Sequence, residues 1–223
     1  MVKNSTYEEA VELLSTNFHK TQNSGIYEHC LLEDCWCQWD SGESKVVIIM
    51  DDYVLKTSFT GTVIYEDEDA VELNDNFEDY CKIEYEIFLK AIDAGIDDVF
   101  CWVQPCNDKV YAQERVDFTI FDYEEGEAEY DDDYFEDGFP PYYAESYHAL
   151  TDRCRALGVP NIRRYVRDDA LPYVLASFSQ EMLQRLTLFF EENDINDLHT
   201  NNIGYVDGKL KFFDYSGYCN ETM

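Results

Sequence analysis

Basic residues are scarce in this sequence of 223 residues. Sixteen Lys and Arg residues stand against 48 Asp and Glu residues, which gives a formal net charge of −32 at pH 7. Because a chain of this charge repels the phosphate backbone, we expect no direct binding to nucleic acid. The excess is uneven, since residues 1–150 carry a net charge of −29 and residues 151–223 carry −3.

Long apolar runs are also missing. No stretch approaches the roughly 20 consecutive apolar residues of a transmembrane helix, and the opening MVKNSTYEEA lacks the basic and apolar regions of a signal peptide. We therefore expect a cytoplasmic protein that does not bind membranes. The motifs H-E-x-x-H and G-x-S-x-G are absent, so the sequence does not support a zinc or serine hydrolase.

The pair C-x-x-C is absent, although the chain has eight cysteines. In a cytoplasmic protein we expect these cysteines to be thiols. His29, Cys30, Cys35 and Cys37 are neighbours in sequence, as metal ligands often are, but zinc sites usually contain tighter pairs. The spacing therefore argues against zinc. An apolar content of 45% is enough for the core of one domain or of two small lobes.

The most informative segment lies near the end of the sequence. It reads DLHTNNIG, then YVDG, then KLKFFDYSG. Asp197 is followed after five residues by Asn202 and after twelve more by Asp214, with a predicted β-hairpin between the last two. Phosphoryl transfer uses one carboxylate to orient a hydroxyl group, and an amide with a second carboxylate to hold Mg²⁺.

This segment resembles the catalytic loop and the metal-binding aspartate of the protein-kinase and aminoglycoside-phosphotransferase superfamily. It is most similar to small kinase-like proteins of phages and prophages. The resemblance implies that Asp197 is the catalytic aspartate, that Asn202 and Asp214 bind the Mg²⁺ of Mg·ATP, and that His199 matches the loop histidine of the phosphotransferases. Ile195 and Asn196 depart from the His-Arg or His-Gly of the family.

Two strands are predicted upstream, over residues 45–50 and 53–59, around a turn at Asp51-Asp52. Val54-Leu55-Lys56 is similar to the Val-Ala-Ile-Lys strand of protein kinases, which implies that Lys56 binds the α- and β-phosphates of ATP.

A helix is predicted over residues 81–94, with Asn76 or Asp79 as its N-cap and Gly95 as its stop. The resemblance implies that this helix carries a glutamate that pairs with Lys56. Glu84 lies on the apolar face of the helix and is favoured over Glu86.

The phosphate-binding loop is expected at residues 40–44, before the first strand. It has one glycine, Gly42, where G-x-G-x-x-G has three, and Glu43 would repel a triphosphate unless it points away. Residues 99–103 and 110–118 are predicted to pair as strands around a turn at Asn107-Asp108. Residues 113–116 would then form the hinge that meets the adenine ring. Further helices are expected over residues 5–20, 145–157 and 172–193.

Residues 122–137 contain ten acidic residues in sixteen, interleaved with aromatic residues. This block is either a solvated loop or a docking surface for a basic partner. We expect such a partner to be a nucleic-acid-binding host protein and not nucleic acid itself. The only basic cluster comprises five arginines, which either bind a phosphate or neutralise the acidic block: Arg153, Arg155, Arg163, Arg164 and Arg167.

We expect an α+β protein with a reduced protein-kinase-like fold. Residues 1–121 would form an antiparallel sheet of about five strands with one helix. Residues 122–141 would be the acidic insertion, and residues 142–223 a truncated helical lobe. Five residues should converge: Lys56, Glu84, Asp197, Asn202 and Asp214.

The sequence is compatible with three functions. The first is a Mg·ATP-dependent phosphotransferase that acts on a host protein. The second is a catalytically weak acidic protein of kinase-like fold that mimics nucleic acid and inhibits a host nucleic-acid-binding or defence protein by occupying its binding groove. The third is a pseudokinase that binds a nucleotide without transfer.

Overall fold

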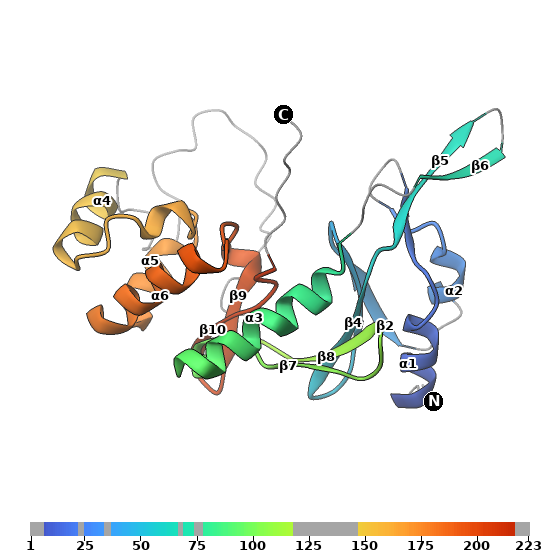
Figure 1. The fold of residues 1–223 in the computed structure, drawn as a ribbon, viewed down its shortest axis with the longest axis horizontal. Helices are drawn as coiled ribbons and strands as arrows, with labels where there is room; N and C mark the ends of the chain where they lie inside the picture. Colours follow the sequence, from blue (N-terminus) through green and yellow to red (C-terminus); the bar gives the residue numbers. More distant parts are fainter. Residues whose placement is uncertain are drawn as a thin grey trace, which may run out of the picture. The chain divides into compact units, whose positions relative to one another are not determined.

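The computed structural model describes residues 7–21, 25–33, 37–66, 69–73, 78–117 and 147–216 (Figure 1). The chain divides into two compact units. Unit 1 comprises residues 1–97 and 101–115, and unit 2 comprises residues 98–100 and 116–223. The acidic insertion predicted at residues 122–141 lies outside the described residues, as does the predicted boundary at residue 121. None of the described helices is long and apolar enough to cross a membrane.

Unit 1 contains a five-stranded antiparallel sheet with the strand order β2-β3-β4-β8-β7. The predicted antiparallel sheet of about five strands is therefore confirmed. Its strands are β2 (Gln38–Ser41), β3 (Lys45–Ile49), β4 (Tyr53–Ser58), β7 (Val103–Pro105) and β8 (Val110–Glu114).

One face of this sheet packs on the core of unit 1. Val46, Ile48 and Leu55 alternate along β3 and β4 and are fully buried, as period-two strands with one apolar face require. Helix α1 (Tyr7–Leu14) packs against β4 and buries Leu14 in the same cluster.

Helix α1 is shorter than the predicted helix over residues 5–20. The side chains of Ser15 and Thr16 bond to carbonyl oxygens of the last turn, with distances of 2.6 Å to Val11 O and 2.8 Å to Leu13 O. Such side chains offer the backbone an alternative to further helix, so the helix ends at Leu14.

A second sheet was not predicted. It has the order β1-β5-β6, with β1 (His19–Thr21) parallel to β5 (Gly61–Glu66) and β5 antiparallel to β6 (Asp69–Leu73). Figure 1 shows β5 and β6 as a hairpin at the edge of unit 1. A short helix, α2 (His29–Glu33), also belongs to this unit.

Helix α3 (Tyr80–Ala94) has the boundaries that its capping residues predict. The Asp79 side chain accepts from Lys82 N at 3.1 Å, and Gly95 adopts the left-handed conformation with φ 63°. Ile96 N donates to Ala91 O at 3.0 Å, which completes the helix end. Buried positions recur at three- and four-residue spacing, so one face of α3 is fixed in unit 1.

The predicted strand pair near residues 99–118 is only partly correct. The turn lies at residues 106–109, where Asn107 Oδ1 accepts from Lys109 N and Val110 N, both at 2.8 Å. The strand before it begins later than predicted, at Val103. Phe100 forms instead a backbone bridge with Phe212 and is fully buried in unit 2.

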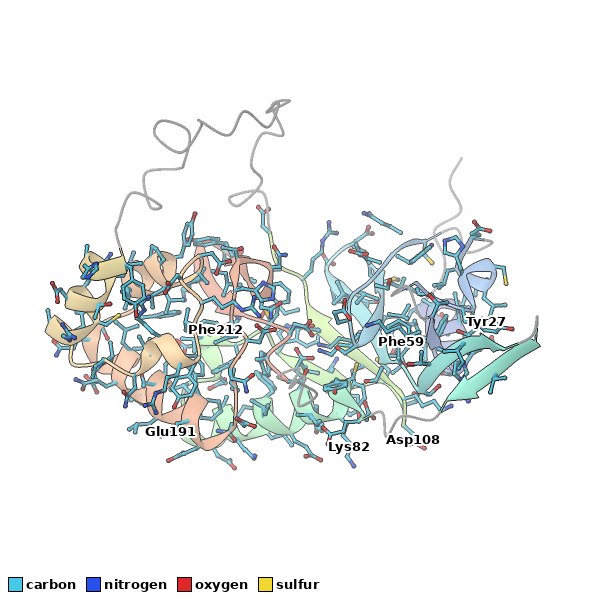
Figure 2. All side chains as sticks on the ribbon, turned by 90° about the horizontal axis from the view of Figure 1, so that it is seen from above. Tyr27, Phe59, Lys82, Asp108, Glu191 and Phe212 are labelled. Carbon is cyan, nitrogen blue, oxygen red and sulfur yellow. The ribbon has the colours of Figure 1, made fainter. Side chains whose placement is uncertain are left out.

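Over its described residues, unit 2 is largely helical, and its last two strands form a hairpin. Its elements are α4 (Tyr147–Ala156), η2 (Ile162–Arg164), α5 (Leu171–Ser177), α6 (Gln180–Glu192), η3 (Thr200–Asn202), β9 (Ile203–Val206) and β10 (Lys209–Phe212). The aromatic ring of Phe212, labelled in Figure 2, lies 5.6 Å from that of Phe100 and 5.4 Å from that of Phe190. This cluster holds β10 against α6.

The single helix predicted over residues 172–193 is two helices. Phe178 and Ser179 are extended, with ψ 146° and 157°, and the Ser179 side chain accepts from Met182 N. Ser179 is thus the N-cap of α6, a signal that the apolar periodicity on both sides conceals. The predicted helix over residues 145–157 is confirmed as α4 within the described residues.

Candidate functional site

Unit 1 contains a buried lysine–glutamate pair. Lys56 Nζ on β4 lies 2.5 Å from Glu84 Oε2 on α3, and the side chains are 2% and 0% exposed. The contact predicted between Lys56 and Glu84 is therefore confirmed. Glu86 instead lies on the exposed face of α3, 4.0 Å from Lys82, which projects outward in Figure 2.

A second buried lysine, which the sequence analysis missed, reaches the same carboxylate. Lys45 Nζ on β3 lies 3.3 Å from Glu84 Oε2, with a side chain 5% exposed. The strand register explains the meeting, because Lys45 pairs with Ser58 and Val47 with Lys56. Lys45 and Lys56 are thus diagonal neighbours on one face of the hairpin. This register could have been counted outward from the Asp51-Asp52 turn.

Gln113 completes the cluster of Lys45, Lys56, Glu84 and Gln113, here called the lysine cluster. Lys56 Nζ donates to Gln113 Oε1 at 2.5 Å, and Gln113 is 4% exposed. The prediction that Gln113 and Glu114 lie in a hinge is wrong, because β8 continues through Glu114. The sheet pairing of Gln113 with Val54 turns its side chain inward.

Burial governs the titration of the lysine cluster. Burial alone would raise the pKa of Glu84, but the positive charges of Lys45 and Lys56 outweigh it and hold that pKa below its usual value. Burial, together with the charge of Lys56, lowers the pKa of Lys45 despite the opposing effect of Glu84. Burial also raises the pKa of the nearby Cys81 thiol to about 11, so Cys81 is a poor nucleophile.

Two polar atoms of the lysine cluster are buried without a hydrogen-bond partner among the described residues. They are Glu84 Oε1 and Gln113 Nε2. Buried polar atoms are normally paired, so each of these costs roughly 1–3 kcal/mol in the free protein. Such an atom in a folded protein calls for an explanation, and a bound water, an ion or a catalytic role can supply it.

The loop of Gly42 joins β2 to β3, so the prediction that it precedes the first strand is wrong. Gly42 N donates to Lys45 O at 3.1 Å, and an added Cβ at Gly42 would meet open space. The Glu43 carboxylate forms an ion pair with Lys20 on β1. This carboxylate is therefore neutralised by a lysine of its own unit.

In unit 2 the predicted catalytic loop is held by its own asparagine. Asn202 Nδ2 donates to Asp197 O at 2.7 Å, and Phe213 N donates to Asn202 O at 3.0 Å. The first bond uses the amide nitrogen of Asn202, so the atom of this side chain that can accept or coordinate is its oxygen. The second bond ties Phe213, the residue before Asp214, to the loop that carries Asp197 and Asn202.

Among the residues that the structure describes, three aspartates have positive φ. Asp207 (φ 50°) precedes Gly208 in the β9–β10 turn, and Asp194 (φ 54°) follows the end of α6. Both are turn positions that tolerate the left-handed region. Asp214 (φ 53°) lies just beyond β10, in a bend that leads into a turn, and this position also tolerates the left-handed region.

Asp197 also has a partner that the sequence did not predict. Arg167 Nη2 lies 2.5 Å from Asp197 Oδ1, with side chains 63% and 27% exposed. Arg167 N donates to Leu198 O at 2.8 Å, which holds the two segments side by side. His199 accepts from Asn201 N through Nδ1 at 3.2 Å and so caps η3.

Asn202 and Asp214 are the metal ligands that the sequence predicts, and they offer an amide oxygen and a carboxylate. Mg²⁺ is commonly bound by only one or two protein groups of this kind, together with phosphate oxygens. In the part of the chain that the structure describes, no three His, Cys, Asp or Glu side chains form a candidate metal site. Cys37 is disulfide-bonded, so the expectation that all cysteines are thiols is wrong for this residue.

Comparisons of the chain with protein-family models, with curated proteins and with solved structures found no match.

Proposed function

We propose that this protein is a phosphotransferase of reduced protein-kinase-like fold that moves the γ-phosphoryl group of Mg·ATP to a hydroxyl group of a host protein. The observation that supports this most strongly is the buried contact between Lys56 and Glu84. A buried ion pair is a poor device for stability, because desolvation offsets much of its attraction. The need to hold a lysine rigidly at a phosphate-binding site would explain why such a pair is present.

Lys56 is suited to bind a phosphate. Within the described part of the chain it donates to Glu84 and Gln113, which leaves one of its three N–H groups for a phosphate oxygen. Glu84 would position the ammonium group, and Gly42 would leave room for the phosphates at the β2–β3 loop. Positioning and electrostatics of this kind supply most of the acceleration in phosphoryl transfer.

Unit 2 would supply the acceptor chemistry. Asn202 and Asp214 would hold Mg²⁺, which neutralises charge on the phosphates when it is bound. The acceptor oxygen attacks the γ-phosphorus, the bond from that phosphorus to the bridging oxygen of ADP breaks, and the hydroxyl proton passes to the Asp197 carboxylate. Asp197 would orient the hydroxyl, since Asn202 fixes its backbone.

Nucleotide binding tests this proposal. We expect calorimetry to detect Mg·ATP binding by the wild type, and a loss of affinity on the order of 10-fold or more in Lys56→Met, because a charge-assisted bond to phosphate is removed. Lys90→Met is the matched control, since Lys90 is exposed on the same helix as Glu84. Equal affinities in the two variants would contradict the role of Lys56.

A second function, inhibition of a basic host protein by occupation, is favoured by one observation, the net charge of −32 with ten acidic residues among residues 122–137. This block lies outside the described residues. Deleting residues 122–137 should weaken the pull-down of such a partner at low salt, because steering by charge is screened at high salt. Equal recovery by the wild type and the deletion would rule the docking role out.

A further inference from the structure

A pocket of about 510 Å³ lies in unit 2, close to the predicted catalytic loop. Its volume lies within the range of small-molecule sites, roughly 300–1,000 Å³. The residues around it are Tyr147, Thr151, Pro160, Arg163, Arg167 and Asp168. One of them, Arg167, is the partner of Asp197.

The first arginine of this pocket is fixed. Arg163 Nη2 lies 2.6 Å and 2.7 Å from the two carboxylate oxygens of Asp168, and its guanidinium lies 3.8 Å from the centre of the Tyr147 ring. Arg163 also donates to the Thr151 hydroxyl and is 14% exposed. Its charge is therefore neutralised by Asp168, and its side chain forms a rigid wall.

The second arginine is held loosely. The Arg167 side chain is 63% exposed, and within the described residues its guanidinium contacts Asp197 alone. An exposed ion pair contributes little free energy, because water screens the charges and because holding two side chains in one geometry costs conformational entropy. Most of the five N–H groups of Arg167 remain available to a ligand in the pocket.

The contact of Arg167 with Asp197 has a chemical consequence. Oδ1 of Asp197 forms an ion pair with Arg167, so an acceptor hydroxyl must compete with the guanidinium for that oxygen. An anionic group that draws Arg167 toward itself would remove the competition. The surroundings permit such a group, since residues 151–223 carry a net charge of only −3.

We infer that this pocket binds an oxyanion, a carboxylate or phosphate group on the acceptor, through Arg167, and that this binding releases Asp197. The selection of an acceptor rests on the proposed phosphotransferase activity, whereas the binding of an anion by this pocket does not depend on that activity. An acceptor with an acidic group beside its hydroxyl would thus be selected, because it alone frees the aspartate that orients the hydroxyl. Neutral acceptors would meet Asp197 still paired with Arg167.

Anion titration without nucleotide tests the inference. The full chain is titrated with inorganic phosphate and, separately, with acetate, and binding is followed by the Nε–H NMR signals of the arginine side chains. We expect the Arg167 signal to shift on binding. Arg167→Gln should weaken binding by about 10-fold, since a charge-assisted contact is lost. Comparing the two anions decides between phosphate and carboxylate.

Two further variants make the test specific. Arg155→Gln is the matched control, because Arg155 is 67% exposed and pairs with Asp152 on the surface of α4. It should leave binding unchanged. Asp197→Asn should tighten binding by roughly two- to fivefold, because Arg167 loses its competing partner.

Two outcomes would overturn the inference. One is equal weakening in Arg167→Gln and Arg155→Gln, which would indicate a diffuse effect of net charge. The other is no gain of affinity in Asp197→Asn. Because no nucleotide is present, either result is independent of whether the protein binds Mg·ATP or transfers phosphate.

Discussion

Glu84→Gln should lower the free energy of unfolding of unit 1 by about 3–5 kcal/mol, the range found when one partner of a buried ion pair is removed. The substitution keeps the shape of the side chain but leaves the ammonium groups of Lys45 and Lys56 without their shared carboxylate. The depressed pKa of Glu84 has the same origin, the attraction of the two lysines. The loss therefore reports on charge and not on a cavity.

Urea unfolding followed by tryptophan fluorescence measures this effect, because the fluorescence signal comes from unit 1. All three tryptophans, Trp36, Trp39 and Trp102, belong to the sequence of unit 1. Glu86→Gln is the control, because Glu86 lies on the same helix but is 57% exposed, and we expect a change within about 0.5 kcal/mol. Similar midpoints for the two variants would show that the Glu84 carboxylate does not offset the buried charges of Lys45 and Lys56.

Asp197→Asn should reduce phosphate transfer on the order of 100-fold or more, the usual cost of removing a group that acts in the transition state. The amide keeps the size of the side chain but cannot take the hydroxyl proton. Because Asn202 and Asp214 are untouched, the affinity for Mg·ATP should stay within about twofold. A single-turnover measurement separates this loss from any change in product release.

Asp207→Asn provides the control for this substitution. Asp207 is exposed in the β9–β10 turn with φ 50°, a conformation that asparagine also tolerates. The same chemical change in the same unit should therefore leave transfer unchanged. If Asp207→Asn lowered transfer as much as Asp197→Asn, the loss would reflect a general disturbance of unit 2.

Features set by neighbouring residues were predictable from the sequence. Helix α3 has the boundaries that Asp79 and Gly95 indicate, and Glu84 lies on the buried face that its apolar neighbours indicate. The hairpin of β9 and β10 follows from the Asp207-Gly208 turn. Each of these signals acts within a few residues, so no tertiary information was needed.

Features that depend on register or on distant segments were missed. Lys45 reaches Glu84 because of the pairing of β3 with β4, and Gln113 turns inward because β8 pairs with β4. Arg167 meets Asp197 across thirty residues of sequence, and exposed arginines carry no pattern that names a partner. The residues that contact the predicted site residues could therefore not be predicted from the sequence. The residues with kinase-like spacing could be identified from the spacing alone.

The measurement that tests the central proposal most directly is transfer of radiolabelled phosphate from ATP. Purified wild-type protein is incubated with a bacterial lysate and Mg²⁺, with Lys56→Met and Asp197→Asn in parallel. The proposal predicts labelled protein with the wild type, and little or none with the variants or without Mg²⁺. The absence of wild-type label, together with no calorimetric binding of Mg·ATP, would contradict the phosphotransferase and favour a protein that acts by occupying its partner.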